Sequence, residues 1–192
     1  PSQTISAPIT IDLNVAGTVE IVGGFGTCTD PLPIAGQRTT VSLNSPSAFT
    51  IQNAGASTRT FTLQQVALIA GVGSGRLVDV SGRVFVNVDN SLLSAGKAND
   101  GGNVRMAGPN VTLFITGGAT IYSGDATNNG GGVHCSGGGS VLLDDGGISD
   151  NDADVAGGGI YLDGCSMNVF AGGGSVGCPG GTNRGIVCNT AG

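Results

Sequence analysis

Aromatic residues are scarce in this chain: they make up 4% of its 192 residues, and tryptophan is absent. A β-propeller blade usually carries an aromatic motif and needs roughly 40 residues or more, so this scarcity argues against a propeller. No apolar run approaches the length of about 18 residues that a membrane-spanning helix needs, the most continuous run being around 66–72. Helix signals are weak throughout. We therefore expect short β-strands and no transmembrane segment.

Basic residues are also few. The chain has 7 Lys and Arg against 13 Asp and Glu, which gives a net charge of −6. Seven of the acidic residues lie between Asp125 and Asp163, whereas no Lys or Arg occurs between Arg105 and Arg184. Such a surface repels phosphate backbones, so we expect no nucleic-acid partner. Divalent cations and basic partners fit the charge better.

Glycine is the residue in excess, at 37 of 192. There is no Gly-X-Y period and proline is ordinary at 7 residues, which excludes collagen. Hydrophobic residues at 39% and charged residues at 10% argue against disorder. Glycine therefore indicates tight corners, where the backbone needs positive φ or close approach.

Four glycine-led segments repeat in the second half of the chain at spacings of 29, 27 and 26 residues. They are Val104-Arg-Met106, Val133-His-Cys135, Ile160-Tyr-Leu162 and Ile186-Val-Cys188. Repeats of this length with few charges and no helical period are typical of a β-solenoid. Further short apolar alternations within each repeat predict two or three strands per turn.

Strand alternation assigns a face to each residue of these segments. The first and third residues of each segment are apolar, so we expect them to stack inside. The middle residues, Arg105, His134, Tyr161 and Val187, then form an outward row.

The chain reads as one domain with three regions. Residues 1–36 are expected to form an N-terminal cap and the first strands, with the loop 28–34 as part of the lid. Residues 37–96 are expected to form irregular coils, and residues 97–192 the regular, glycine-rich coils. The stretch 94–104 is interpreted as a long corner loop. At about 27 residues a coil, the sequence predicts about seven coils and a rod on the order of 35 Å long.

Five cysteines are present, at 28, 135, 165, 178 and 188, and none forms C-x-x-C. With a single histidine, the chain has too few ligands for a zinc site. Cys135 and Cys188 fall on inward repeat positions and suit an apolar core. Cys165 and Cys178 lie in glycine-rich segments and are the expected disulfide pair, which an oxidising extracellular compartment would permit.

Two groups of side chains are candidate sites. The outward row Arg105, His134 and Tyr161 could bind an anionic sugar; alternatively, it is an ordinary set of outward polar positions on a rod. The second group could bind Ca²⁺, because aspartates at alternate positions of a turn can supply several of its oxygen ligands; alternatively, they are solvated turn residues. This group comprises Asp144, Asp145, Asp150, Asp152 and Asp154.

The segment Ile148-Ser-Asp-Asn151-Asp-Ala153, followed by Gly157-Gly-Gly-Ile160-Tyr, resembles the parallel β-helix repeats of bacterial surface and autotransporter-type proteins, including the polymorphic outer-membrane protein family. In that family, I-x-x-N-x-A precedes G-G-G/A-I. The opening Val22-Gly-Gly-Phe25, followed by Cys28, resembles the N-terminal caps of secreted pectin-lyase-like β-helices. The resemblance implies a right-handed parallel β-helix with an N-terminal cap.

That fold also hosts polygalacturonases and pectate lyases, whose catalytic sets are not matched here. A polygalacturonase would imply Asn-Thr-Asp, Asp-Asp, Gly-His-Gly and Arg-x-Lys in that order, and only Asp144-Asp145 is present. A pectate lyase would imply an arginine beside calcium carboxylates, and the acidic region contains none. We expect no catalytic residues and no cofactor other than calcium.

Three functions remain open. The first is a non-catalytic secreted or cell-surface β-helix that acts as an adhesin-like stalk or structural module. The second is a self-assembling extracellular filament subunit that stacks head to tail through its ends. The third is a β-helix that binds or cleaves a polysaccharide or another cell-surface ligand. We expect a processed, extracellular segment whose signal peptide has been removed. We also expect the solenoid to continue, either through further coils or through another molecule stacked on its end.

Overall fold

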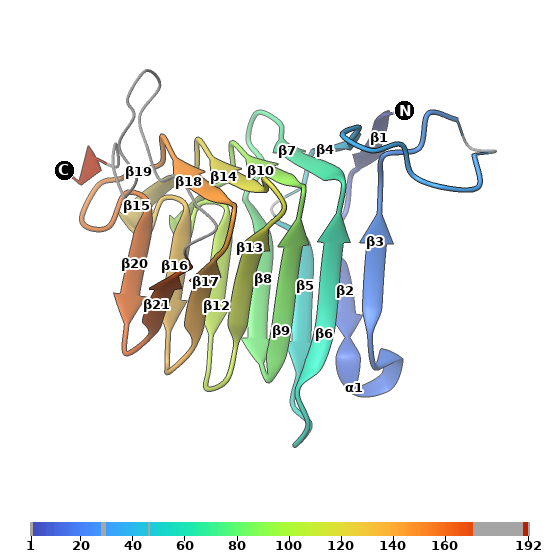
Figure 1. Cartoon of the computed structure of the whole chain (residues 1–192). Coiled ribbons are helices and arrows are strands. Elements are labelled where there is room, and N and C mark those ends of the chain that lie inside the picture. Colours follow the sequence, from blue (N-terminus) through green and yellow to red (C-terminus); the bar gives the residue numbers. More distant parts are fainter. Residues whose placement is uncertain (1, 28–29, 46, 171–189, 192) are drawn as a thin grey trace.

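The computed structural model describes residues 2–27, 30–45, 47–170 and 190–191. The chain winds into a parallel β-solenoid in which each turn adds one strand to each of three sheets (Figure 1). Every strand pair in the described residues is parallel, and the only helix among them has four residues. The predicted all-β solenoid is therefore confirmed.

Three sheets, which we call A, B and C, each contain six strands. Sheet A consists of β1 (Ser2–Ile5), β4 (Thr39–Leu43), β7 (Val66–Ala70), β10 (Leu92–Ser94), β14 (Thr120–Tyr122) and β18 (Gly147–Ser149). Sheet B consists of β2 (Ile9–Asp12), β5 (Ser47–Asn53), β8 (Arg76–Gly82), β12 (Val104–Ala107), β16 (Val133–Ser136) and β20 (Ile160–Asp163). Sheet C consists of β3 (Val19–Val22), β6 (Arg59–Gln64), β9 (Val84–Asp89), β13 (Thr112–Thr116), β17 (Ser140–Leu143) and β21 (Ser166–Val169).

A fourth sheet, D, starts only in the fourth turn. It consists of β11 (Lys97–Asp100), β15 (Asp125–Asn129), β19 (Asp152–Ala153) and β22 (Thr190–Ala191). The stretch 94–104, expected to be a long corner loop, therefore contains a strand. Its single inward residue, Ala98, belongs to a column of alanines with the buried Ala126 and Ala153. Alanine carries too weak a hydrophobic signal for this strand to be recognised from sequence alternation.

The number of turns is smaller than the predicted seven. The first and last of the six strands in a sheet are five steps apart. The described residues therefore make about five turns and a rod about 24 Å long at ~4.8 Å per step. The first turn is longer than the repeat suggests, because Ser2 pairs with Thr40. The extra residues include 23–27 and 30–38, which project from the end of the rod (Figure 1).

The inward columns form one continuous core, as the alternation predicts. Val104, Val133, Met106 and Cys135 are fully buried, and Ile160 is 9% exposed. Leu162, also expected inside, is 37% exposed on β20, the last strand of sheet B. Ile186 and Cys188 lie outside the described residues.

The first turn is the open end of this core. Ile9 of β2 is 40% exposed, whereas its register partner Phe49 is 3% exposed and the next residue of the column, Val78, is buried. A one-turn helix, α1 (Leu13–Ala16), joins β2 to β3 and buries Leu13. The predicted N-terminal cap remains a prediction.

Glycine occupies a repeated corner between sheets D and B. Gly101, Gly130 and Gly157 have φ values of 65°, 68° and 65°. A Cβ atom at each would collide with the carbonyl oxygen three residues ahead, in Val104, Val133 and Ile160 respectively. Only glycine fits a left-handed corner this tight, which explains why a glycine run opens each repeat.

Asparagine side chains secure the neighbouring corner. The amide oxygen of Asn151 accepts hydrogen bonds from the Gly124 backbone N–H, at 2.8 Å, and from the Asn103 amide, at 3.2 Å. Its Nδ2 donates to the carbonyl oxygens of Ile121 and Ser149. Asn151 is 1% exposed, so the asparagine of the surface-protein motif is a buried corner residue.

The disulfide differs from the expected one. Cys165 is bonded to Cys135, with a Cα–Cα distance of 6.1 Å, so the expected bridge between Cys165 and Cys178 is wrong. Cys135 points into the core from β16, and the turn between β20 and β21 brings Cys165 over it from the next coil. Cys178 lies outside the described residues.

Candidate functional site

The outer face of sheet B carries the predicted row of side chains in register. Parallel pairing aligns Arg105 with His134 and His134 with Tyr161. The row extends further than predicted, since Arg105 also pairs with Asp79, and Asp79 with Thr50. We call this set the donor row, after the hydrogen-bond donors of Arg105, His134 and Tyr161. Its members, in order along the rod, are Thr10, Thr50, Asp79, Arg105, His134 and Tyr161.

His134 and Tyr161 are stacked on each other. Their ring centroids lie 5.4 Å apart and the ring planes differ by 12°. Stacking along the rod axis directs the edges of the rings outward, which places polar ring atoms and not ring faces at the surface. Both side chains are half-buried. Each ring restricts the rotamers of the other, so these two polar groups are held in place before any ligand binds.

His134 is held in its neutral form. Partial burial of the ring lowers its pKa below the ordinary value, and the positive charges of Arg105 and Arg76 lower it further. The carboxylates of Asp100 and Asp163 act in the opposite direction but do not reverse the shift. The Nδ1 atom is buried and has no hydrogen-bond partner among the described residues, so a proton there would be unsatisfied. We infer that the proton of the neutral ring is on Nε2, where it serves as a donor.

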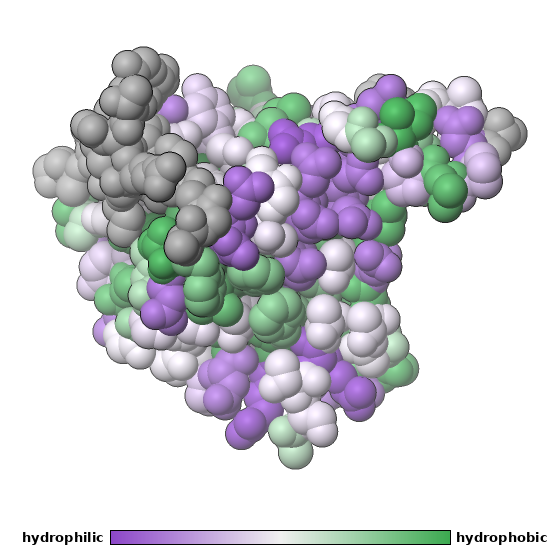
Figure 2. Space-filling model, viewed as in Figure 1, coloured by the Kyte–Doolittle hydropathy of each residue, from purple (hydrophilic) through white to green (hydrophobic). Residues whose placement is uncertain are grey.

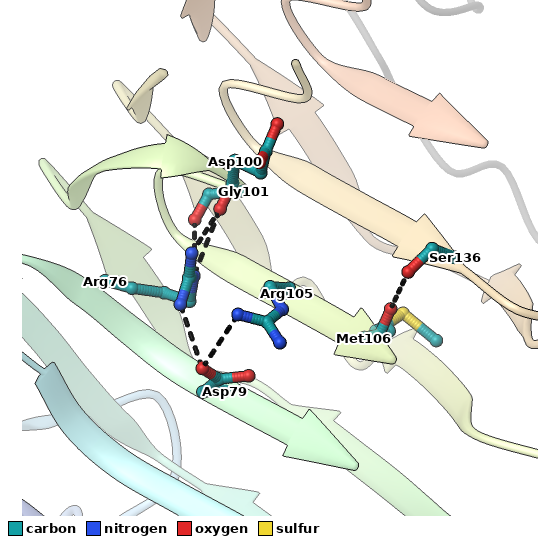
Figure 3. Close-up of polar contacts among 7 residues, drawn as sticks. All are labelled: Arg76, Asp79, Asp100, Gly101, Arg105, Met106 and Ser136. Carbon is teal, nitrogen blue, oxygen red and sulfur yellow. Dashed lines mark hydrogen bonds and ion pairs between the residues drawn. The ribbon is translucent and has the colours of Figure 1, made fainter. Parts of the chain in front are cut away.

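Two arginines share one carboxylate beside the stack (Figure 3). Arg76 lies 2.9 Å from Asp79 and donates to the carbonyl oxygens of Asp100 and Gly101, with its side chain only 13% exposed. Arg105 lies 3.6 Å from Asp79, beyond hydrogen-bond distance, and its side chain is 42% exposed. The guanidinium of Arg105 therefore keeps donors free for a ligand, and the trio has an excess of one positive charge.

A second outward row runs beside the donor row, two residues further along each strand. It consists of Asp12, Gln52, Ser81, Ala107, Ser136 and Asp163. The three central members, Ser81, Ala107 and Ser136, are small. No long side chain of this row therefore projects from the sheet beside Arg105 and His134. An extended ligand could lie on these small residues and receive hydrogen bonds from the donor row at one side.

The five aspartates are not brought together. Asp145 and Asp150 have left-handed φ values of 54° and 53°, which aspartate tolerates better than most residues, and they lie at corners on either side of β18. Asp152 on β19 and Asp154, directly after this strand, are both exposed. In the part of the chain that the structure describes, no three His, Cys, Asp or Glu residues are grouped so as to hold a metal ion. The structure therefore gives no support to the expected calcium site, Asp144 included, which stays a prediction.

Arg76 and Asp79 are the site residues that sequence reasoning missed. The segment Val78-Asp79-Val80 has the same alternation as Val104-Arg105-Met106 and precedes it by 26 residues. Opposite charges at equivalent positions of successive coils indicate an ion pair across the strands. The repeat was recognised by the Gly-Gly pair before its first strand, and no such pair precedes Val78.

Apolar side chains gather near the middle of the face seen in Figure 2, with hydrophilic residues above and below them. On sheet C, the outward-facing residues Phe85, Phe114 and Leu142 are half-buried. The two phenylalanine rings lie 6.1 Å apart and are tilted by 53°. Sheet C thus carries an apolar patch on its outer surface at these three residues, whereas the donor row of sheet B is charged and polar.

Comparison with protein-family models, with curated proteins and with solved structures finds no match for this chain. None of the described helices is both long and apolar enough to cross a membrane.

Proposed function

We propose that this chain is a non-catalytic, adhesin-like module of a secreted or cell-surface protein, and that it binds a polysaccharide on the outer face of sheet B. The observation that carries the proposal is the register of Arg105, His134 and Tyr161, which lines up three hydrogen-bond donors at steps of about 4.8 Å. Donors in this arrangement suit a ligand that repeats acceptor oxygens along its length, which a linear polysaccharide does.

The charge around Arg105 favours an anionic polysaccharide. Asp79 is shared by Arg76 and Arg105, and Arg105 lies 3.6 Å from it, so the Arg105 guanidinium can still pair with an anionic group although the carboxylate of Asp100 also acts on Arg76. A carboxylate or sulfate of the ligand could form a charge-assisted hydrogen bond with Arg105. The disulfide between Cys135 and Cys165 supports an extracellular location, because such bonds persist in oxidising compartments. The resemblance to bacterial surface repeats points in the same direction.

The test is a binding measurement on immobilised alginate, heparin and dextran, the first two anionic and the third neutral. We expect the wild-type chain to bind an anionic polymer more tightly than dextran. Arg105→Gln should weaken this binding about tenfold, since a hydrogen bond to a charged group contributes about 1.5–3 kcal/mol. The matched control is Arg59→Gln, which removes the same charge from an exposed position on β6. Equal effects of the two substitutions would contradict the proposal.

The absence of catalysis is tested on the same polymers. Prolonged incubation with the wild-type chain should release neither reducing nor unsaturated sugar ends. Release of such ends, lost in a Tyr161→Phe or His134→Gln variant, would show that the face cleaves its ligand and does not only bind it.

A second candidate function is a filament subunit, and the open first turn favours it. The core column ends at Ile9, which is 40% exposed, and the outer edges of β1, β2 and β3 have no partner strand among the described residues. A parallel coil from another copy would cover both. Electron microscopy of the purified chain should then show rods of many subunits that Ile9→Lys disperses; rods of single-subunit length only would rule this function out.

A further inference from the structure

A polar hollow lies on the same side of the molecule as the donor row, where β2, β5 and β8 end beside α1. It is open to solvent and has a volume of about 400 Å³. Five of its seven lining residues have polar side chains, namely Asp12, Asn14, Gln52, Asn53 and Ser81, and the other two are Ala54 and Gly82.

Only some of the polar groups around the hollow form hydrogen bonds within the protein. The Asn53 amide is committed, because Nδ2 donates to the carbonyl oxygens of Ser57 and Arg83 and Oδ1 accepts from the Gly55 N–H. One carboxylate oxygen of Asp12 accepts from the Asn14 N–H at 3.0 Å. Within the described residues, the side chains of Asn14, Gln52 and Ser81 have no hydrogen-bond partner.

The hollow continues the second outward row of sheet B. Asp12, Gln52 and Ser81 belong to both, and the small residues Ala107 and Ser136 extend the row to the positions beside Arg105 and His134. No bulky side chain of this row stands between the hollow and the free donors. The hollow begins one strand step from Arg105, at Ser81, and Asp12 and Tyr161 are five steps or about 24 Å apart.

We propose that the hollow is a second subsite for the ligand of the donor row, so that one polysaccharide chain lies parallel to the solenoid axis and contacts both. This inference rests on the proposed function. The donor row takes the charged groups of the ligand through Arg105, and the hollow takes sugar hydroxyls through the amides of Asn14 and Gln52 and the hydroxyl of Ser81. A short oligomer seated at the stacked rings does not reach the hollow, whereas a longer one spans both subsites.

The test uses oligomers of alginate and of heparin, graded by length from the dimer upward, and a variant that carries Asn14→Ala and Gln52→Ala. Both side chains are exposed, so the fold should not depend on them. We expect the variant to bind dimers as the wild type does and to bind the longest oligomers about fivefold to tenfold more weakly, from the loss of two neutral hydrogen bonds. The matched control is Asn128→Ala, at an exposed position on sheet D.

The outcomes separate the two claims. If Arg105→Gln weakens binding at every length while the hollow variant has no effect, or an effect independent of length, the hollow is not a subsite and the proposed function stands. If the wild-type chain binds neither oligomer series, both the subsite and the proposed function are wrong.

Discussion

At the scale of single residues, the surroundings of His134 alter its protonation. It is packed against Tyr161 with a buried, unpaired Nδ1, and its pKa is lowered mainly by burial. The folded state therefore binds a proton less readily than the unfolded state, in which the pKa is about 6.5. The contribution of this site to stability is fully present above pH 6.5 and is lost as the pH falls below that value.

This direction of the pH dependence of stability gives a first prediction. The wild-type chain should lose free energy of unfolding relative to His134→Phe as the pH falls from about 8 to about 5, because phenylalanine keeps the ring but does not titrate. Urea denaturation at several pH values measures the difference between the two proteins. A difference that stays constant, or that grows in favour of the wild type as the pH falls, would contradict the assignment of a neutral, poorly solvated ring.

Asn151 gives a second prediction at the same scale. Its side chain makes four hydrogen bonds at a buried corner, and Asn151→Ala leaves the Gly124 N–H and two carbonyl oxygens without that partner. We expect a loss of about 1–3 kcal/mol in the free energy of unfolding. Asn168→Ala, at an exposed position on β21, should change it by less than about 0.5 kcal/mol. Equal losses in the two variants would mean that the corner network contributes little.

At the scale of elements, the disulfide ties the coil that contains β16 to the next coil, which contains β20. Cys135 is on β16 and Cys165 lies 30 residues later in the turn after β20. Closing a loop of this size removes conformational freedom from the unfolded chain and is expected to stabilise the fold by about 3 kcal/mol.

The third prediction follows from this tie. Cys165→Ser should lower the free energy of unfolding by about 3 kcal/mol under oxidising conditions and have little effect on the protein in reductant. Peptide mapping of the oxidised wild type should recover the fragment that joins Cys135 to Cys165. A fragment that joins Cys165 to Cys178 would contradict the described pairing.

Elements are also where the sequence was most and least informative. The strands with Val, Ile, Leu or Phe at alternate positions, such as 39–43, 60–63 and 83–88, were predictable because the period of two is strong in them. Strand β11 and helix α1 were not, since Ala98 and a single helical turn at Leu13 carry no periodic signal. The partner of Cys165 was missed because an inward cysteine was interpreted as a simple core residue.

At the scale of the whole molecule, parallel register converts spacing along the sequence into a line of side chains in space. The repeat predicted that Arg105, His134 and Tyr161 share one line, and the structure places them there. The calcium hypothesis is not supported because it relied on closeness in sequence, whereas aspartates such as Asp145 and Asp150 lie at corners beyond opposite ends of β18. The hollow could not be predicted, because it arises from the ends of three strands and from α1.

The central claim is that an extended anionic polysaccharide binds on the outer face of sheet B. Backbone NMR chemical-shift mapping with a long heparin or alginate oligomer tests it most directly, since every face of the solenoid is observed at once. We expect the largest shift changes at Arg105, His134 and Tyr161, with smaller ones at the hollow around Gln52. Changes confined to the sheet C surface around Phe85 and Phe114, or to the first turn, would contradict the claim.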